Sequence, residues 1–153
     1  SGIGTGAATG TGWDDLTNGN PIIDILAAKQ NMRTNGYNPE GVVLAINPVE
    51  HKNLMVYLIS TKGSSIPNFS SEKVKTGVVM EILGCKVLVS QNATTDEAAL
   101  WIPNRAATWK SFIPMTAVTV QDPGIGTKIR VWEEGEAICT DPKAVYVITD
   151  TVS

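Results

Sequence analysis

His51 is the only histidine among the 153 residues, so a Ser–His–Asp or Cys–His mechanism would have to use it. No Gly-x-Ser-x-Gly nucleophile pattern accompanies it. Cys85 and Cys139 are far apart, and no Cys-x-x-Cys or His-x-x-x-His pair sets up a zinc site. We expect His51 to be a surface or helix-side residue and both cysteines to be buried small apolar residues. A disulfide between them stays open, because spacing cannot show it.

Two glycine-rich stretches resemble phosphate-binding loops only superficially. The stretch at residues 2–6 has neither the dinucleotide-binding spacing nor a strand before it. The stretch at residues 124–128 lacks the full phosphate-loop spacing, and a strand pattern rather than a helix follows it. We predict loops at both places and expect neither a cofactor nor a metal.

Acidic residues form three clusters, at Asp14 and Asp15, at Asp96 and Glu97, and at Glu133, Glu134 and Glu136. Alternate residues of a strand share a face, so Glu134 and Glu136 are expected to point the same way. A general acid–base pair stays open. Solvated charge or an ion pair between subunits is the preferred interpretation, because dispersed arginines such as Arg130 could supply the cations from a neighbouring chain.

Composition narrows the class of protein. The net charge of −3 gives no general attraction to nucleic acid or anionic membrane, and no direct nucleic-acid site is evident. No run of 18 apolar residues occurs, so no membrane span is predicted, and no signal peptide is visible.

The elements that would position these side chains begin with a helix–strand–helix unit. Asn20-Pro21 starts a helix that Gly36 ends, with Ile22, Ile25, Leu26 and Met32 expected on its buried side. Residues 42–46 are continuously apolar, so both faces of this strand should be covered. Asn47-Pro48 starts a second helix, in which Glu50 could reach back as in a capping box.

The rest of the chain favours strands. Residues 61–75 form a long polar loop, and strand patterns follow from Val78 onward. Residues 99–102 and 106–109 flank Pro103-Asn104-Arg105 as a hairpin-like pair. Residues 1–19 are predicted to be a flexible Gly-rich arm or linker, in which Trp13 should dock on the folded part. The fold class is α+β, with two helices packed on a mixed or antiparallel sheet.

Taken together, the motifs resemble the axial domain of tailed-virus major capsid proteins of the Hong Kong 97 type. The resemblance covers about residues 13–150. It is carried by the order and spacing of four motifs: Gly36-Tyr37-Asn38-Pro39, then Asn47-Pro48, then Leu83-Gly84-Cys85-Lys86-Val87, and a closing Pro142-Lys143-Ala144-Val145. It implies an axial-type domain at 20–126 and C-terminal strands of the peripheral domain at 127–153.

The resemblance also implies a function. We expect a structural protein without enzyme activity that self-assembles into the pentamers and hexamers of an icosahedral virus head. It would be found in the virion, and in the host cytoplasm during assembly. Its partners would be further copies of itself and other virion proteins. The alternatives are the shell protein of an encapsulin nanocompartment, which has the same fold, and a small hydrolase that uses His51. Family members carry an arm, an extended loop and a spine helix before this unit, so we expect a piece of a longer protein that alone stays monomeric.

Two sets of residues are candidates for assembly contacts. The loop at residues 60–75 is expected at the centre of a capsomer, and its candidate residues are Ser60, Lys62, Ser64, Ser65, Pro67 and Lys73. The later strand with alternating charge is expected to touch a neighbouring subunit through Arg130, Trp132, Glu134 and Glu136.

Overall fold

The computed structural model describes residues 2–61 and 81–153, and the chain divides into two units. One unit consists of Ser1–Ala106 with Asp141–Ser153, and the other of Ala107–Thr140. Each is described by itself below.

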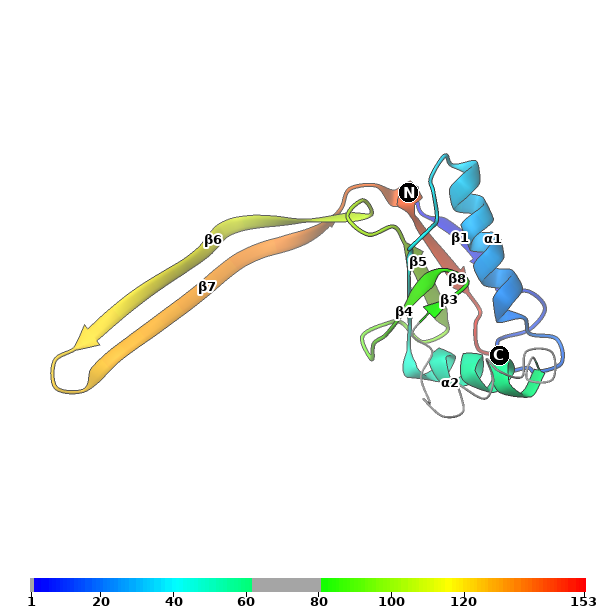
Figure 1. The fold of residues 1–153 in the computed structure, drawn as a ribbon, viewed down its shortest axis with the longest axis horizontal. Coiled ribbons are helices and arrows are strands. Elements are labelled where there is room, and N and C mark those ends of the chain that lie inside the picture. Colours follow the sequence, from blue (N-terminus) through cyan, green and yellow to red (C-terminus); the bar gives the residue numbers. More distant parts are fainter. Residues whose placement is uncertain (1, 62–80) are drawn as a thin grey trace. The chain divides into compact units, whose positions relative to one another are not determined.

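The larger unit contains a mixed sheet that, among the described residues, has six strands in the order β1-β8-β5-β2-β4-β3. The strands are β1 Gly4–Ala7, β2 Val43–Ile46, β3 Glu81–Ile82, β4 Cys85–Val89, β5 Glu97–Trp101 and β8 Val145–Thr149. The pairs β1–β8 and β2–β4 are parallel and the others antiparallel. The helices are α1 Pro21–Thr34 and α2 Pro48–Val56, which a π-helical turn, Tyr57–Thr61, continues (Figure 1). The predicted α+β class with two helices on a mixed sheet is confirmed.

Local capping signals place both ends of α1. The Ile23 N–H donates to Asn20 Oδ1 at 3.3 Å, which satisfies one of the open donors of the first turn. At the other end, Gly36 has a φ of +85°. The Gly36 N–H donates to Arg33 O at 2.9 Å and the Tyr37 N–H to Met32 O at 3.0 Å. These two bonds form a Schellman motif, so the predicted glycine stop is confirmed.

The core lies between the helices and one face of the sheet. Its buried members include Ile25, Ala28 and Met32 of α1, Leu44 and Ile46 of β2, Leu54 of α2, and Leu100 of β5. Leu26 was expected in this group, but it is 48% exposed. It follows Ile25 directly, and one helical residue is a rotation of roughly 100° away from the buried stripe. The other face of β2 is less covered, since Val43 is half-buried and Ala45 lines a surface hollow.

The N-terminal segment differs from the predicted flexible arm. Gly4–Ala7 forms β1 beside β8, and Trp13 is fully buried, so only the docking of Trp13 is as expected. Glycine is needed here for close approach, because a Cβ on Gly4 would lie 2.7 Å from Cδ2 of Tyr146. Glycine at position 4 is therefore explained by its packing against the ring of Tyr146.

The hairpin-like pair expected around residues 103–105 is wrong. β5 pairs with β2 on one side and β8 on the other, so neither of its edges is open. Between the strands, the N–H groups of Arg105 and Ala106 both donate to Ile102 O, which makes a helical turn.

The smaller unit is an antiparallel hairpin of β6 Ala107–Asp122 and β7 Gly126–Cys139 (Figure 1). Gly124 and Gly126, with φ of +84° and +129°, make the turn, so the glycine stretch at 124–128 is a loop as predicted, although its last residues enter β7. Cys139, at the end of β7, is exposed, which contradicts its predicted burial. Cys85 is buried as expected, and both cysteines are free.

Candidate assembly interface

The candidate catalytic residue, His51, lies half-buried in the first turns of α2. Burial lowers the pKa of its imidazole below the ordinary value. Within residues 2–61 and 81–153, no group of three or more His, Cys, Asp or Glu side chains could hold a metal ion. No helix of the described part is long and apolar enough to cross a membrane.

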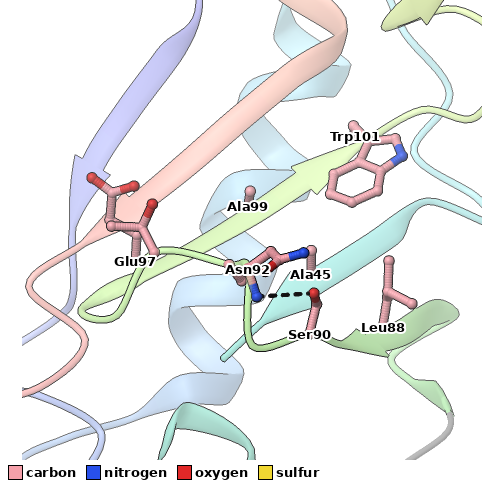
Figure 2. Close-up of a pocket in the computed structure, with 9 residues that line it drawn as sticks. Ala45, Leu88, Ser90, Asn92, Glu97, Ala99 and Trp101 are labelled. Carbon is pink, nitrogen blue, oxygen red and sulfur yellow. Dashed lines mark hydrogen bonds between the residues drawn. The ribbon is translucent and has the colours of Figure 1, made fainter. Parts of the chain in front are cut away.

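The open face of the sheet carries a hollow of about 350 Å³ (Figure 2). Trp101 and Glu97 lie toward its two ends on β5, and Ala45 and Leu88 form part of its floor. The Asn92 N–H donates to Ser90 Oγ at 3.2 Å along its rim. Among the described residues that line the hollow, Glu97 is the single carboxylate, and no histidine or cysteine accompanies the hydroxyls of Ser90 and Thr94.

Tyr37, the aromatic residue of the Gly-Tyr-x-Pro turn, anchors the last strand to the end of α1. Its hydroxyl donates to Asp141 Oδ2 at 2.7 Å, and Arg105 Nε lies 3.4 Å from the same oxygen. The Arg105 guanidinium also sits 4.9 Å from the centre of the Tyr37 ring. The hydrogen bond from the Tyr37 hydroxyl is the main cause that lowers the pKa of Asp141. The same hydrogen bond raises the pKa of Tyr37.

This cluster predicts an acid-dependent contribution to stability. A carboxyl group whose pKa is lower in the folded than in the unfolded state stabilises the fold above its unfolded pKa, and the effect is lost as pH falls through the folded pKa. We expect Asp141→Asn to unfold at lower urea than the parent at pH 7, and the difference to shrink as the pH falls below about 4. Urea titrations between pH 3 and 7 measure this. A difference that stays constant with pH would contradict the assignment, and Lys143→Gln, a neighbouring exposed change, is the control.

The candidate capsomer-centre loop is visible only at its start. Ser60 lies one residue before the end of the described part of this region, in the π-helical turn, where its hydroxyl donates to Val56 O at 2.6 Å. The other candidates, Lys62, Ser64, Ser65, Pro67 and Lys73, lie outside the described residues. Their role stays a prediction.

The structure brings the second candidate set together on one strand. Arg130, Trp132, Glu134 and Glu136 occupy alternate positions of β7, so their side chains share one face of it. All four are exposed. Their contact with a neighbouring subunit stays a prediction.

Sequence reasoning missed the apolar side chains that the hairpin exposes. Phe112 is 63% exposed, Met115 74%, Ile125 80% and Ile129 72%. The signal for them was the long apolar-rich run with few turn residues between 106 and 121, which describes a strand far longer than its neighbours.

Comparisons with known proteins identify the fold. No family model and no curated protein matches the chain. A solved structure from Mycobacterium phage Che8 matches with a TM-score of 0.64 at 19% identity, covering 99% of this chain and 55% of the other. The capsid structure of the cyanophage P-SCSP1u matches with a TM-score of 0.62 at 15% identity, covering 99% of this chain and 52% of the other. The crystal structure of a virus-like particle from Pyrococcus furiosus matches with a TM-score of 0.55 at 17% identity, covering 97% of this chain and 56% of the other.

The chain thus spans about half the length of each solved structure that it matches. Nearly all of it takes part in each match, the long hairpin included. Identities under 20% reveal the fold and leave the function open. The chain has the tailed-virus major capsid-type fold that the resemblance implied.

Proposed function

We propose that this chain is a non-enzymatic structural subunit that self-assembles into a closed protein shell, and that the shell is the head of a tailed virus. The hairpin β6–β7 is the observation that carries the proposal. A two-stranded hairpin is marginally stable alone, and this one exposes large apolar side chains along its length. Such surface is typical of contacts with other protein.

The exposed apolar surface of the hairpin would be covered by protein of the same shell, either by the remainder of the subunit or by neighbouring copies. A shell built from one kind of subunit needs repeated contacts and rigid wedges rather than a reaction centre. The single histidine of the sequence, which does not line the hollow, agrees with this function. A hydrolase that uses His51 has no comparable support.

Within this function, a major capsid protein in the virion is the first candidate, with pentamers and hexamers as capsomers. The matches to the Che8 and cyanophage structures support it. An encapsulin-type shell is the second candidate, and the match to the Pyrococcus furiosus particle favours it. The loop at residues 60–75, which begins in the π-helical turn after α2, would line the capsomer centre, as the resemblance to capsid proteins implies.

The test is electron microscopy of the whole protein after expression, with Ile129→Asp beside the unchanged protein and Thr119→Ser as a matched control on the facing strand. We expect closed shells from the unchanged protein and from Thr119→Ser. Ile129→Asp should give soluble, folded subunits and few shells, because a charge replaces an apolar side chain that is 72% exposed in this chain. If the unchanged whole protein stayed a monodisperse monomer across the range of pH, salt and protein concentration tested, this result would contradict the proposal.

A further inference from the structure

One face of β7 carries positive charges on one side of Trp132 and negative charges at the same spacing on the other side. Lys128 and Arg130 lie on the side of the hairpin turn, and Glu134 and Glu136 lie on the other side. All five occupy alternate positions of a strand that carries no bulge, so they share one face. The residues two positions before and after Trp132, Arg130 and Glu134, carry opposite charges. The residues four positions before and after it, Lys128 and Glu136, also carry opposite charges.

Such an order is complementary to itself in one arrangement. When two identical strands pair antiparallel about a two-fold axis, each residue faces the one equally far beyond the axis in the other copy. With the axis at Trp132, Arg130 faces Glu134 of the second copy, and Lys128 faces Glu136. Opposite charges placed directly across a strand pair are favourable, whereas parallel pairing in register would set like charges side by side.

Within the hairpin, the two charges nearest Trp132 have uncharged cross-strand neighbours. Arg130 stands opposite Val118, and Glu134 stands opposite Ile113. No ion pair in the described part of the chain includes Arg130 or Glu134. Glu136 stands opposite Lys110, which can neutralise it within the hairpin, so Arg130 and Glu134 are the charges most in need of a partner from another chain.

The two edges of the hairpin differ in their ability to accept another strand. β6 contains both register shifts of the ladder, between Ser111 and Ile113 and between Ile113 and Thr116, and it contains Pro114, which has no N–H to donate. β7 is continuous and free of proline over 14 residues. Bulges and proline blunt an edge, and a long regular edge is a template for pairing. Among the described residues, the outer edge of β7 has no strand partner.

From this we infer that β7 pairs edge to edge and antiparallel with β7 of a second copy, with Trp132 on the two-fold axis. This inference rests on the proposed function, since a shell subunit must meet further copies of itself. The contact is isologous: the hairpins would form a continuous four-stranded sheet, with a pair of Trp132 side chains at its centre and ion pairs at either side.

Cysteine cross-linking of the whole protein tests the axis directly. In a background with the exposed Cys139 replaced by Ser, Trp132→Cys should give a covalent dimer under mild oxidation. Residues on the axis have Cα atoms about 4.5–5.5 Å apart, within the range of a disulfide. Ala137→Cys, also exposed on β7, is the matched control. Its two copies would be ten residues apart, about 34 Å, and should not cross-link. No dimer at 132 in a variant that still associates, or an equal amount of dimer at 137, overturns the inference.

Charge exchange tests the register even if Trp132→Cys does not assemble. Arg130→Glu and Glu134→Arg should each weaken association of the whole protein at least tenfold by light scattering. The double variant R130E/E134R should recover most of it, because both pairs are restored with reversed polarity. A double variant as weak as the singles overturns the register. Shells from the unchanged protein without a 132 cross-link would refute this inference alone, and a 132 cross-link without shells would refute the proposed shell function alone.

Discussion

Replacing Trp13 by Ala should lower the free energy of unfolding of the helix-and-sheet unit by about 3–5 kcal/mol, the usual loss for a buried Trp. Trp13 is fully buried, and its Nε1–H donates to Asp24 Oδ2 at 2.8 Å. Its backbone N–H donates to Thr151 O at 2.7 Å. The indole therefore joins the N-terminal segment, helix α1 and the C-terminal residues in one place.

The loss has two parts that a second variant separates. Asp24 is itself buried, and its other oxygen accepts the Thr9 N–H at 2.8 Å, so both carboxylate oxygens are satisfied in the parent. Trp13→Ala leaves a cavity and removes one of these donors. Trp13→Phe keeps most of the ring volume and removes only the donor, so it should be about 1–3 kcal/mol less stable than the parent.

Urea denaturation followed by circular dichroism is the suitable measurement, because the substitutions change the tryptophan fluorescence. Trp109→Ala is the matched control, since Trp109 is 55% exposed on the hairpin. We expect that control to alter stability by less than about 0.5 kcal/mol, as is usual for exposed positions. Equal losses for Trp13→Ala and Trp109→Ala would show that the N-terminal segment is not part of the core.

The second large effect is expected at Glu50. Its side chain is fully buried in the first turn of α2, where Oε1 accepts the Asp96 N–H at 2.7 Å and lies 3.5 Å from the Thr151 hydroxyl. Oε2 is buried and has no hydrogen-bond partner among the described residues. Glu50→Ala would leave the Asp96 N–H without an acceptor and open a cavity, so we expect a loss of about 2–4 kcal/mol.

Glu50→Gln distinguishes the hydrogen bond from the charge. The amide oxygen can still accept from Asp96, and a neutral group is less costly to bury than a carboxylate. We expect it to lose less than half as much stability as Glu50→Ala in the same urea titration. Glu81→Ala, at an exposed acidic position on β3, is the control. A Gln variant as unstable as the Ala variant would mean that the charge itself is needed.

The role of Glu50 also marks a limit of local sequence reasoning. The pattern Asn47-Pro48-Val49-Glu50 predicted a capping box, and the cap itself is present, since the Val49 N–H donates to Asn47 Oδ1 at 3.2 Å. Glu50 does not complete the box. Its carboxylate binds Asp96 and Thr151, which lie 46 and 101 residues further along the chain. Nothing within a helical turn of Glu50 indicates these partners.

The sequence by itself determined the features that a few neighbouring residues control. These are the asparagine caps, the glycine stop of α1, the central apolar strand β2, the α+β class and, through motif order, the capsid-type fold. Each depends on backbone preferences or hydrogen bonds within about one turn or one strand, so residue type and spacing suffice.

Only the tertiary structure decided which segments meet across long separations. It placed the glycine-rich start of the chain under Tyr146 as a strand, gave both edges of β5 to partners other than β6, and paired β6 with β7 over nearly their whole length. The composition of residues 2–19 is equally typical of a linker, and a strand pattern is the same whichever partner it takes. Strand pairing depends on which edges remain open once the core has formed, and that is a property of the whole chain.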